Sequence, residues 1–280
     1  MSLSNQEDTH PCYPPTRVRS WLVCPELWRL EKRWTPREDG LWSPKRLLGS
    51  ALHTGAAEHF RALRSGSPIS LEETHAKAHI VLAREYVEQD VWTLESLNRL
   101  VDKGITLLLG KLRLTPGTKI LAVDEPVDRR KPDLVTSLND KLSVYDWKLI
   151  QSLDSRYLHE RLDAFLHSWQ LLDYAYFTQE HFQRPVVEVS PVLVILGPKA
   201  MVQMQPVHLE PERIQQWKQQ ADVVWALMSS GKPWMNLEAC DDKHLHFGKK
   251  CPMYQGCHLL YGNETLFSSI YRVVEEGTHG

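Results

Sequence analysis

A polar turn between two β-type runs is the feature that most constrains the fold of this chain. Residues 134–138 and 142–148 are rich in apolar and aromatic side chains, and Asn139-Asp140 between them is a dipeptide typical of tight hairpin turns. Another β-type run, residues 119–125, precedes them. The three runs predict neighbouring strands of one sheet, the last two of which are joined as a hairpin.

Amphipathic segments surround these strands in the sequence. Ser43-Pro44 predicts the start of the first helix, and Ser65-Gly66 predicts its end. The order of helices, three strands, a helix, two strands and a helix predicts an α/β fold with a mixed central β-sheet flanked by helices. The predicted helices cover residues 44–64, 71–110, 156–180 and 211–230, and a second hairpin covers residues 186–196 and 201–207 with a break at Gly197-Pro198.

Composition excludes several classes of protein. The chain has 280 residues, of which 42% are hydrophobic, and 33 basic side chains stand against 35 acidic ones. These values indicate a globular protein and exclude disorder, collagen and coiled coil. No apolar run approaches the roughly 18 residues of a membrane helix. The first ten residues are polar and include Glu7 and Asp8, so we expect a cytoplasmic protein.

Basic side chains are concentrated near the N-terminus. Residues 17–46 hold eight Lys and Arg against four Asp and Glu. Such an excess can neutralise phosphates, although a solvated helix face gives the same pattern. Some of the ten tryptophans could stack on bases, while most should belong to the core.

Two carboxylates lie on the predicted hairpin. Asp133 opens one strand and Asp146 lies near the end of the next, so both can converge on a hard divalent cation. Alternation along a strand places Lys148 on the same face as Asp146, where it could orient a water molecule or stabilise charge on a phosphate. A single Asp-x-Lys triplet is also typical of a surface ion pair. Glu125 is either a further metal ligand or a group that hydrogen-bonds to a ligand, or it is a surface glutamate at a strand end.

Two predicted helices add polar side chains. His53 shares a helix face with Phe60, and Gln170 lies one turn from Tyr174. Taken alone, His53 is typical of a core histidine, and the other two are typical of helix packing.

Taken together, these residues resemble the PD-(D/E)XK nuclease superfamily. Pro132-Asp133 followed by Asp146-x-Lys148 resembles its central motif, although Arg130 and Lys131 stand where the family often has a small residue. Gly49-Ser-Ala-Leu-His53 and Gln170-Leu-Leu-Asp-Tyr174 resemble helical motifs of the RecB-like branch. The four motifs occur in the expected order over about residues 45–180.

The resemblance implies a restriction-endonuclease-like core and a metal-dependent nuclease. It implies that Mg²⁺ or Mn²⁺ is held by His53, Asp133 and Asp146, and that Lys148 assists the attacking water. It further implies that Gln170 and Tyr174 border the site and contact DNA. By analogy we expect exonuclease action on single-stranded DNA or DNA ends.

The cysteines are unevenly spaced. Cys240, Cys251 and Cys257 fall within eighteen residues, but a closed site for a metal centre needs four thiolates. The fourth must come from a distant segment, and Cys24 in its Cys-Pro context is favoured, while spacing leaves Cys12 open. Buried thiols without a metal are the simpler alternative.

One early and three late cysteines resemble the iron–sulfur nucleases of the RecB-like branch. The resemblance implies a structural [4Fe-4S] cluster held by Cys24, Cys240, Cys251 and Cys257. Zinc on the same thiolates is the alternative, and His244 and His246 could then take part.

These inferences predict three parts of the chain. Residues 1–43 form a basic segment with the first cluster cysteine, residues 44–209 form the nuclease core, and residues 210–280 form a helix and the three-cysteine segment. The expected partner is DNA, and no association with a membrane is expected. Proteins of recombination, repair or CRISPR adaptation are compatible partners. One alternative is a catalytically silent DNA-binding or scaffold subunit. Another is a hydrolase that has a structural zinc and acts on another substrate.

Overall fold

The computed structural model divides into two compact units, residues 42–218 and residues 1–41 with 219–280. The structure describes residues 12–31, 34–36, 43–88, 92–151, 169–196 and 200–230, together with 251, 253, 257, 265 and 270–273. Within these residues, no helix has the length and apolar character needed to cross a membrane.

A mixed β-sheet forms the centre of the 42–218 unit. The order is β2-β3-β4-β5-β6, and β7 pairs with β5. Strands β3 and β4 are antiparallel, whereas β4 and β5 are parallel. Asn139 and Asp140, at the turn between β3 and β4, have φ values of 51° and 60°, as the sequence predicts for a tight hairpin. The strands are Lys119–Val123 (β2), Leu134–Leu138 (β3), Lys141–Gln151 (β4), Val186–Leu196 (β5), Met201–Met204 (β6) and Val207–His208 (β7).

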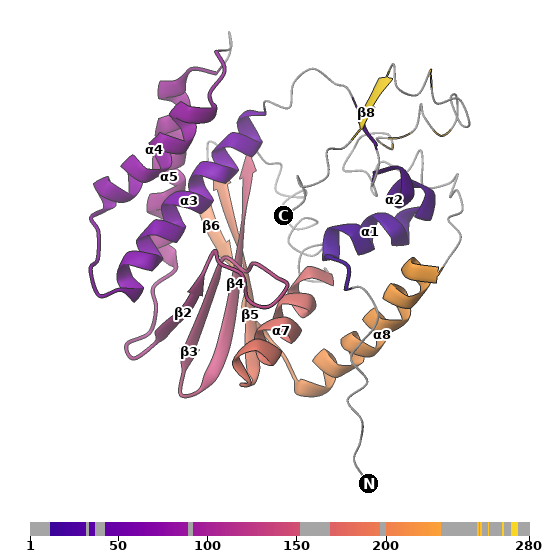
Figure 1. The fold of residues 1–280 in the computed structure, drawn as a ribbon. Helices are drawn as coiled ribbons and strands as arrows, with labels where there is room; N and C mark the ends of the chain where they lie inside the picture. Colours follow the sequence, from indigo (N-terminus) through magenta and orange to yellow (C-terminus); the bar gives the residue numbers. More distant parts are fainter. Residues whose placement is uncertain are drawn as a thin grey trace. The chain divides into compact units, whose positions relative to one another are not determined.

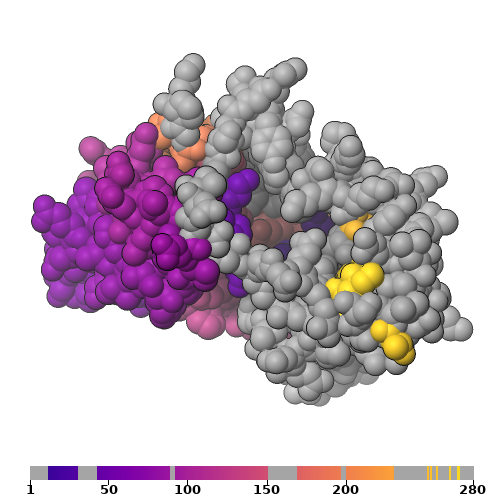
Figure 2. All heavy atoms as spheres, turned by 90° about the horizontal axis from the view of Figure 1, so that it is seen from above, coloured from indigo at the N-terminus to yellow at the C-terminus, as the bar shows by residue number. Residues whose placement is uncertain are grey.

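Helices α3 (Pro44–Arg64) and α5 (Leu94–Lys111) lie on one face of this sheet, and α4 (Leu71–Glu85) packs against both of them (Figure 1). Their apolar side chains pack with Leu134 and Trp147 from the sheet. Helix α3 approaches α4 and α5 so closely at Gly55 that an added Cβ would lie 2.6 Å from Ile105 Cδ1. Figure 2 shows the purple and magenta residues of these helices as one continuous surface.

Helix α7 (Trp169–Phe182) covers the opposite face (Figure 1). Its Leu171 and Ala175 pack with Val135 and Val144 in a second buried cluster. Because side chains alternate along a strand, Leu134 belongs to one core and Val135 to the other. The sheet therefore has two buried faces, and the odd-numbered side chains of β3 point towards α7.

The other unit contains α1 (Pro15–Val23), α2 (Pro25–Glu31) and a small antiparallel sheet of β1 (Trp34–Pro36) and β8 (Tyr271–Val273). It also contains most of α8 (Pro211–Ser230), whose limits are those predicted. Sequence analysis did not predict α1, α2 or this small sheet.

The prediction of one helix over residues 71–110 was wrong. Helix α4 ends at Glu85, Tyr86 has an extended backbone, and α5 begins after Thr93. The Thr93 side chain accepts a hydrogen bond from the Ser96 amide and so caps a new helix. Strands also end earlier than predicted, since β2 stops at Val123 before the left-handed Asp124 and β6 stops at Met204. Residues 156–168 of the predicted helix 156–180 lie outside the described residues.

Candidate active site

Asp133 lies directly before β3 and is 5% exposed. The β3–β4 register pairs Leu134 with Tyr145, so Asp133 comes next to Asp146 one step further along the hairpin. The backbone N–H of Trp147 donates a hydrogen bond of 2.7 Å to Asp133 Oδ2. This bond fixes the carboxylate of Asp133 against the strand that carries Asp146.

Asp146 is 2% exposed, and two polar side chains contact its carboxylate. Lys148 Nζ lies 2.7 Å from its Oδ2, and Gln170 Nε2 donates to its Oδ1 at 3.2 Å. The Lys148 ammonium and the buried Asp146 carboxylate form an ion pair. Burial raises the pKa of Asp146 to about 6; Lys148 opposes this rise and the charge of Asp133 adds to it.

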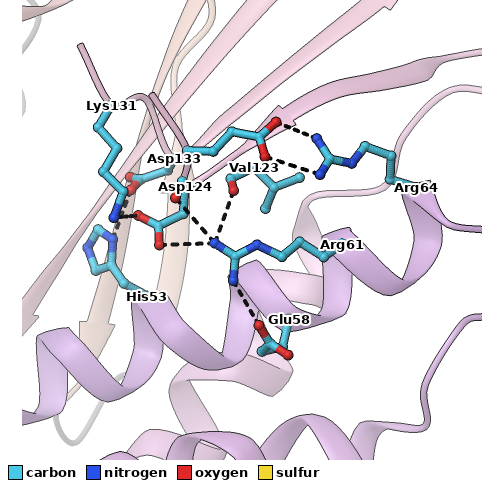
Figure 3. Close-up of polar contacts among 9 residues, drawn as sticks. His53, Glu58, Arg61, Arg64, Val123, Asp124, Lys131 and Asp133 are labelled. Carbon is cyan, nitrogen blue, oxygen red and sulfur yellow. Dashed lines mark hydrogen bonds and ion pairs between the residues drawn. The ribbon is translucent and has the colours of Figure 1, made fainter. Parts of the chain in front are cut away.

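His53 reaches the same place from α3. Its Nδ1 lies 2.8 Å from Asp133 Oδ1, and Figure 3 shows the imidazole directed at this carboxylate. The ring lies 5.9 Å from the fully buried Trp147 ring, centroid to centroid. Burial lowers the pKa of His53, but the hydrogen bond and charge of Asp133 outweigh this effect, so the pKa lies above its ordinary value.

Helix α7 contributes Gln170 and Tyr174 from the opposite face of the sheet. Gln170 Nε2 lies 2.8 Å from the Tyr174 hydroxyl as well as 3.2 Å from Asp146 Oδ1. Burial, with the nearby charge of Asp146, raises the pKa of Tyr174. Tyr174 therefore stays a neutral hydroxyl beside the carboxylates.

The comparisons with known proteins decide the family. The family model of the PD-(D/E)XK nuclease superfamily matches residues 14–258 of the sequence. The chain belongs to the PD-(D/E)XK nuclease superfamily. No curated protein matches it. A crystal structure from Eubacterium rectale, of a protein named as a candidate exonuclease, is 11% identical at a TM-score of 0.43, over 89% of this chain and 94% of that chain.

Membership of this superfamily makes the chain a nuclease with nucleic acid as its substrate. The central mixed sheet with helices on both faces agrees with a restriction-endonuclease-like core. The structure brings all six predicted site residues of this nuclease into one series of contacts. The series includes His53, Asp133, Asp146, Lys148, Gln170 and Tyr174.

The donor types in this nuclease site suit a hard divalent cation. Asp133 and Asp146 offer carboxylate oxygens, and His53 offers an imidazole nitrogen. Asp146 Oδ2 is buried and lies 2.7 Å from the Lys148 ammonium. Within the described part of the chain, no group of three or more His, Cys, Asp or Glu side chains already has a metal-holding arrangement. In this structure His53 contacts Asp133 directly, and Lys148 contacts Asp146 directly.

The segment before Asp133 is tied to α3 by charged side chains that sequence analysis did not connect with the site (Figure 3). Lys131 Nζ lies 2.8 Å from Asp124 Oδ1. Arg61 Nη2 donates to the Val123 and Asp124 carbonyl oxygens, each at 3.2 Å. The left-handed backbone of Asp124, with φ of 47°, turns the chain at this point. In the sequence, acidic Asp124, Glu125 and Asp128 simply precede a basic run at 129–131, which does not indicate these contacts with α3.

Glu125 forms a bidentate ion pair with Arg64 of α3. Arg64 Nη1 lies 2.5 Å from Oε1, and Nη2 donates to Oε2 at 3.1 Å. Both side chains are about one third exposed. The hydrogen bond from Arg64 lowers the pKa of Glu125. The carboxylate is thus engaged by a surface arginine, as in the surface alternative of the sequence analysis.

Glu125→Gln should therefore have small effects. Because the pKa of Glu125 is lowered in the folded protein, its contribution to stability is present at neutral pH and is lost as the pH falls through the folded pKa. We expect the free energy of unfolding at neutral pH to fall by less than about 1 kcal/mol, since solvent screens an exposed pair. Urea unfolding at neutral and acidic pH measures this, and a loss of several kcal/mol would contradict it.

Three of the four predicted cluster cysteines lie in one buried group. Cys24, Cys251 and Cys257 are 3%, 5% and 4% exposed and pack with Met253 and Tyr271 in the unit formed by residues 1–41 and 219–280. Cys24 stands at the junction of α1 and α2, where its carbonyl accepts a hydrogen bond from Trp28 N–H. Cys240, His244 and His246 lie outside the described residues.

Proposed function

We propose that this chain is a Mg²⁺- or Mn²⁺-dependent deoxyribonuclease that acts as an exonuclease on single-stranded DNA or DNA ends. The observation that supports the proposal most is the convergence of Asp133 and Asp146 with His53 and Lys148 at one end of the β3–β4 hairpin. Two buried carboxylates that lie close together repel each other unless a cation lies near them. The stability of the fold alone does not explain why Asp133 and Asp146 are buried close together.

Each side chain has a chemical role in the proposal. Asp133, Asp146 and His53 would hold the divalent cation, which when bound supplies a polarised water and neutralises phosphate charge. Lys148 would orient the attacking water and donate to a phosphate oxygen as negative charge develops there. The Lys148 side chain is 42% exposed, so substrate can reach it.

Gln170 would orient the Asp146 carboxylate, and Tyr174 would contact the substrate. Gln170 orients Asp146 through the hydrogen bond to Oδ1. Tyr174, kept neutral by burial, can donate its hydroxyl proton to a DNA phosphate. The Arg and Lys residues of segment 17–46 would guide the DNA backbone in the same complex.

For the cysteines, the proposal is a structural [4Fe-4S] cluster on Cys24, Cys240, Cys251 and Cys257. The burial of three of these thiols together supports it, because separate structural cysteines need not meet. Zinc on the same thiolates is the competing assignment. A reducing cytoplasm would keep all four thiols available as ligands.

The substrate class is tested with DNA that has or lacks ends. With Mg²⁺ or Mn²⁺, we expect linear single strands and duplex ends to be degraded to short products, because an exonuclease engages a terminus. Covalently closed circular single strands of the same composition should survive. Time courses on labelled substrates in denaturing gels measure this. Equal cutting of circles and linear strands would favour an endonuclease, and cutting of RNA alone would contradict the choice of DNA.

A further inference from the structure

A buried ion pair joins the segment before Asp133 to helix α7. Arg130 is 7% exposed and Asp173 is fully buried. Arg130 Nε donates to Asp173 Oδ2, and Arg130 Nη2 donates to Oδ1 at 2.8 Å, so the guanidinium binds the carboxylate in a bidentate manner. The Arg130 Cζ also lies 4.4 Å from the ring centroid of Phe177, one turn along α7.

The Arg130 end of this pair is held by a tight turn. The Val127 N–H donates to the Arg130 carbonyl at 2.7 Å, and the Arg130 N–H donates to the Val127 carbonyl at 3.1 Å. Asp128, inside this turn, has a left-handed φ of 55°. Asp133 follows three residues after Arg130. The guanidinium therefore has a fixed relation to the first proposed metal ligand.

The Asp173 end lies among the helical site residues. Asp173 directly precedes Tyr174 and follows Gln170 by three residues, which is about one helical turn. Gln170 in turn donates to Asp146 Oδ1. The ion pair thus connects the segment carrying Asp133 with the helix that contacts Asp146.

Stability gives a poor reason for this pair. Removing two charges from water is costly, and apolar residues of similar volume often serve as well or better in a protein interior. What a bidentate pair adds is geometry, since the planar fork fixes both distance and orientation.

We propose that Arg130 and Asp173 are positioning residues of the nuclease reaction: their ion pair sets α7 against the Asp133 segment so that Gln170 holds Asp146 in its ligating orientation. This inference rests on the proposed function, in which Asp146 is a metal ligand. Neither residue contacts the reacting atoms in the proposal. Their effect passes through Gln170 to the binding of the divalent cation.

Three variants of the full chain separate positioning from stability. Arg130→Lys keeps the charge and loses the fork. Asp173→Asn keeps the shape and loses the charge. The double variant Arg130→Met with Asp173→Leu replaces the pair by apolar side chains and is expected to keep the thermal stability of the wild type. Leu97→Ala, on the buried face of α5, is the control for general destabilisation.

The decisive measurement is the Mn²⁺ concentration that gives half-maximal cleavage of a single-stranded oligonucleotide. We expect it to rise about 10- to 100-fold in Arg130→Lys and in the double variant, as for other partners that orient metal ligands, while KM for DNA changes less than about threefold. Leu97→Ala should leave the Mn²⁺ midpoint unchanged at temperatures where it is folded. A double variant with the wild-type midpoint, or an equal shift in Leu97→Ala, would overturn the proposal.

A second readout does not depend on cleavage. Amide hydrogen exchange should become faster at residues 170–174 in the pair variants, with protection of α3 and α5 retained. Unchanged exchange at 170–174 in all three variants would overturn the positioning role even if the wild-type chain cleaved nothing. Absence of metal-dependent cleavage by the wild type would instead count against the proposed function, so the two failures are distinguishable.

Discussion

Asp146→Ala is expected to remove metal-dependent DNA cleavage while leaving DNA binding intact. The side chain is buried between Lys148, which lies 2.7 Å from its Oδ2, and Gln170, which donates to its Oδ1. Its removal takes away a proposed metal ligand and the partner of Lys148 together. Groups that act as one catalytic unit typically cost at least about 10³-fold in rate when one is lost. Single-turnover cleavage and fluorescence anisotropy on the same labelled strand measure the two properties.

The matched control is Glu125→Gln, which alters an acidic side chain two residues beyond Val123 that is already paired with Arg64. It should retain a cleavage rate within about twofold of the wild type, because surface substitutions away from special features have small effects. Asp146→Ala with undiminished cleavage would contradict the proposed site. A wild-type chain that binds DNA and cleaves none would support the scaffold alternative.

Cys24→Ser is expected to prevent formation of the proposed cluster and to unfold the unit formed by residues 1–41 and 219–280. Cys24 shares its buried environment with Cys251 and Cys257, and a hydroxyl is a poor replacement for a thiolate ligand. The binding free energy of a structural four-thiolate zinc site is on the order of 10 kcal/mol, and a metal that binds only the folded chain lends that energy to folding. Iron and sulfide content, visible absorption and limited proteolysis of this unit measure the loss.

Cys12→Ser is the control for the cysteine prediction. Cys12 does not belong to the buried group of Cys24, Cys251 and Cys257, so its replacement should leave metal content and protease resistance as in the wild type. If the purified protein is colourless and contains one zinc per chain, zinc is the correct assignment and the iron–sulfur cluster is not. Anaerobically purified protein with neither metal would contradict both assignments.

The central hairpin was predictable because its signals are local. The period of two in residues 134–138 and 142–148 and the Asn139-Asp140 turn place Asp133 near Asp146 without any knowledge of the rest of the chain. Helix α3 was predictable for the same reason, since Ser43-Pro44 and Ser65-Gly66 mark its ends. That His53 reaches Asp133 from this helix depended on the family resemblance, because its sequence neighbours suit a core histidine equally well.

The parts that were missed depend on tertiary contacts. Nothing local to Asp173 indicates that it is buried against Arg130, since residues 43 positions apart can be paired only by the fold. Local information did exist at Thr93, whose capping of α5 was obscured by apolar spacing that continues across the break. The contact of Arg61 with the Asp124 turn likewise joins segments that are distant in sequence.

The division of the chain into units has a consequence for its synthesis. Residues 42–218 are continuous, whereas the other unit combines 1–41 with 219–280. Because domains fold as units while the polypeptide leaves the ribosome, the sheet that carries Asp133 and Asp146 can form before Cys251 and Cys257 have been translated. Cys24 can meet Cys251 and Cys257 only after residues 42–218 have been synthesised. Any metal centre on these thiols would therefore form last.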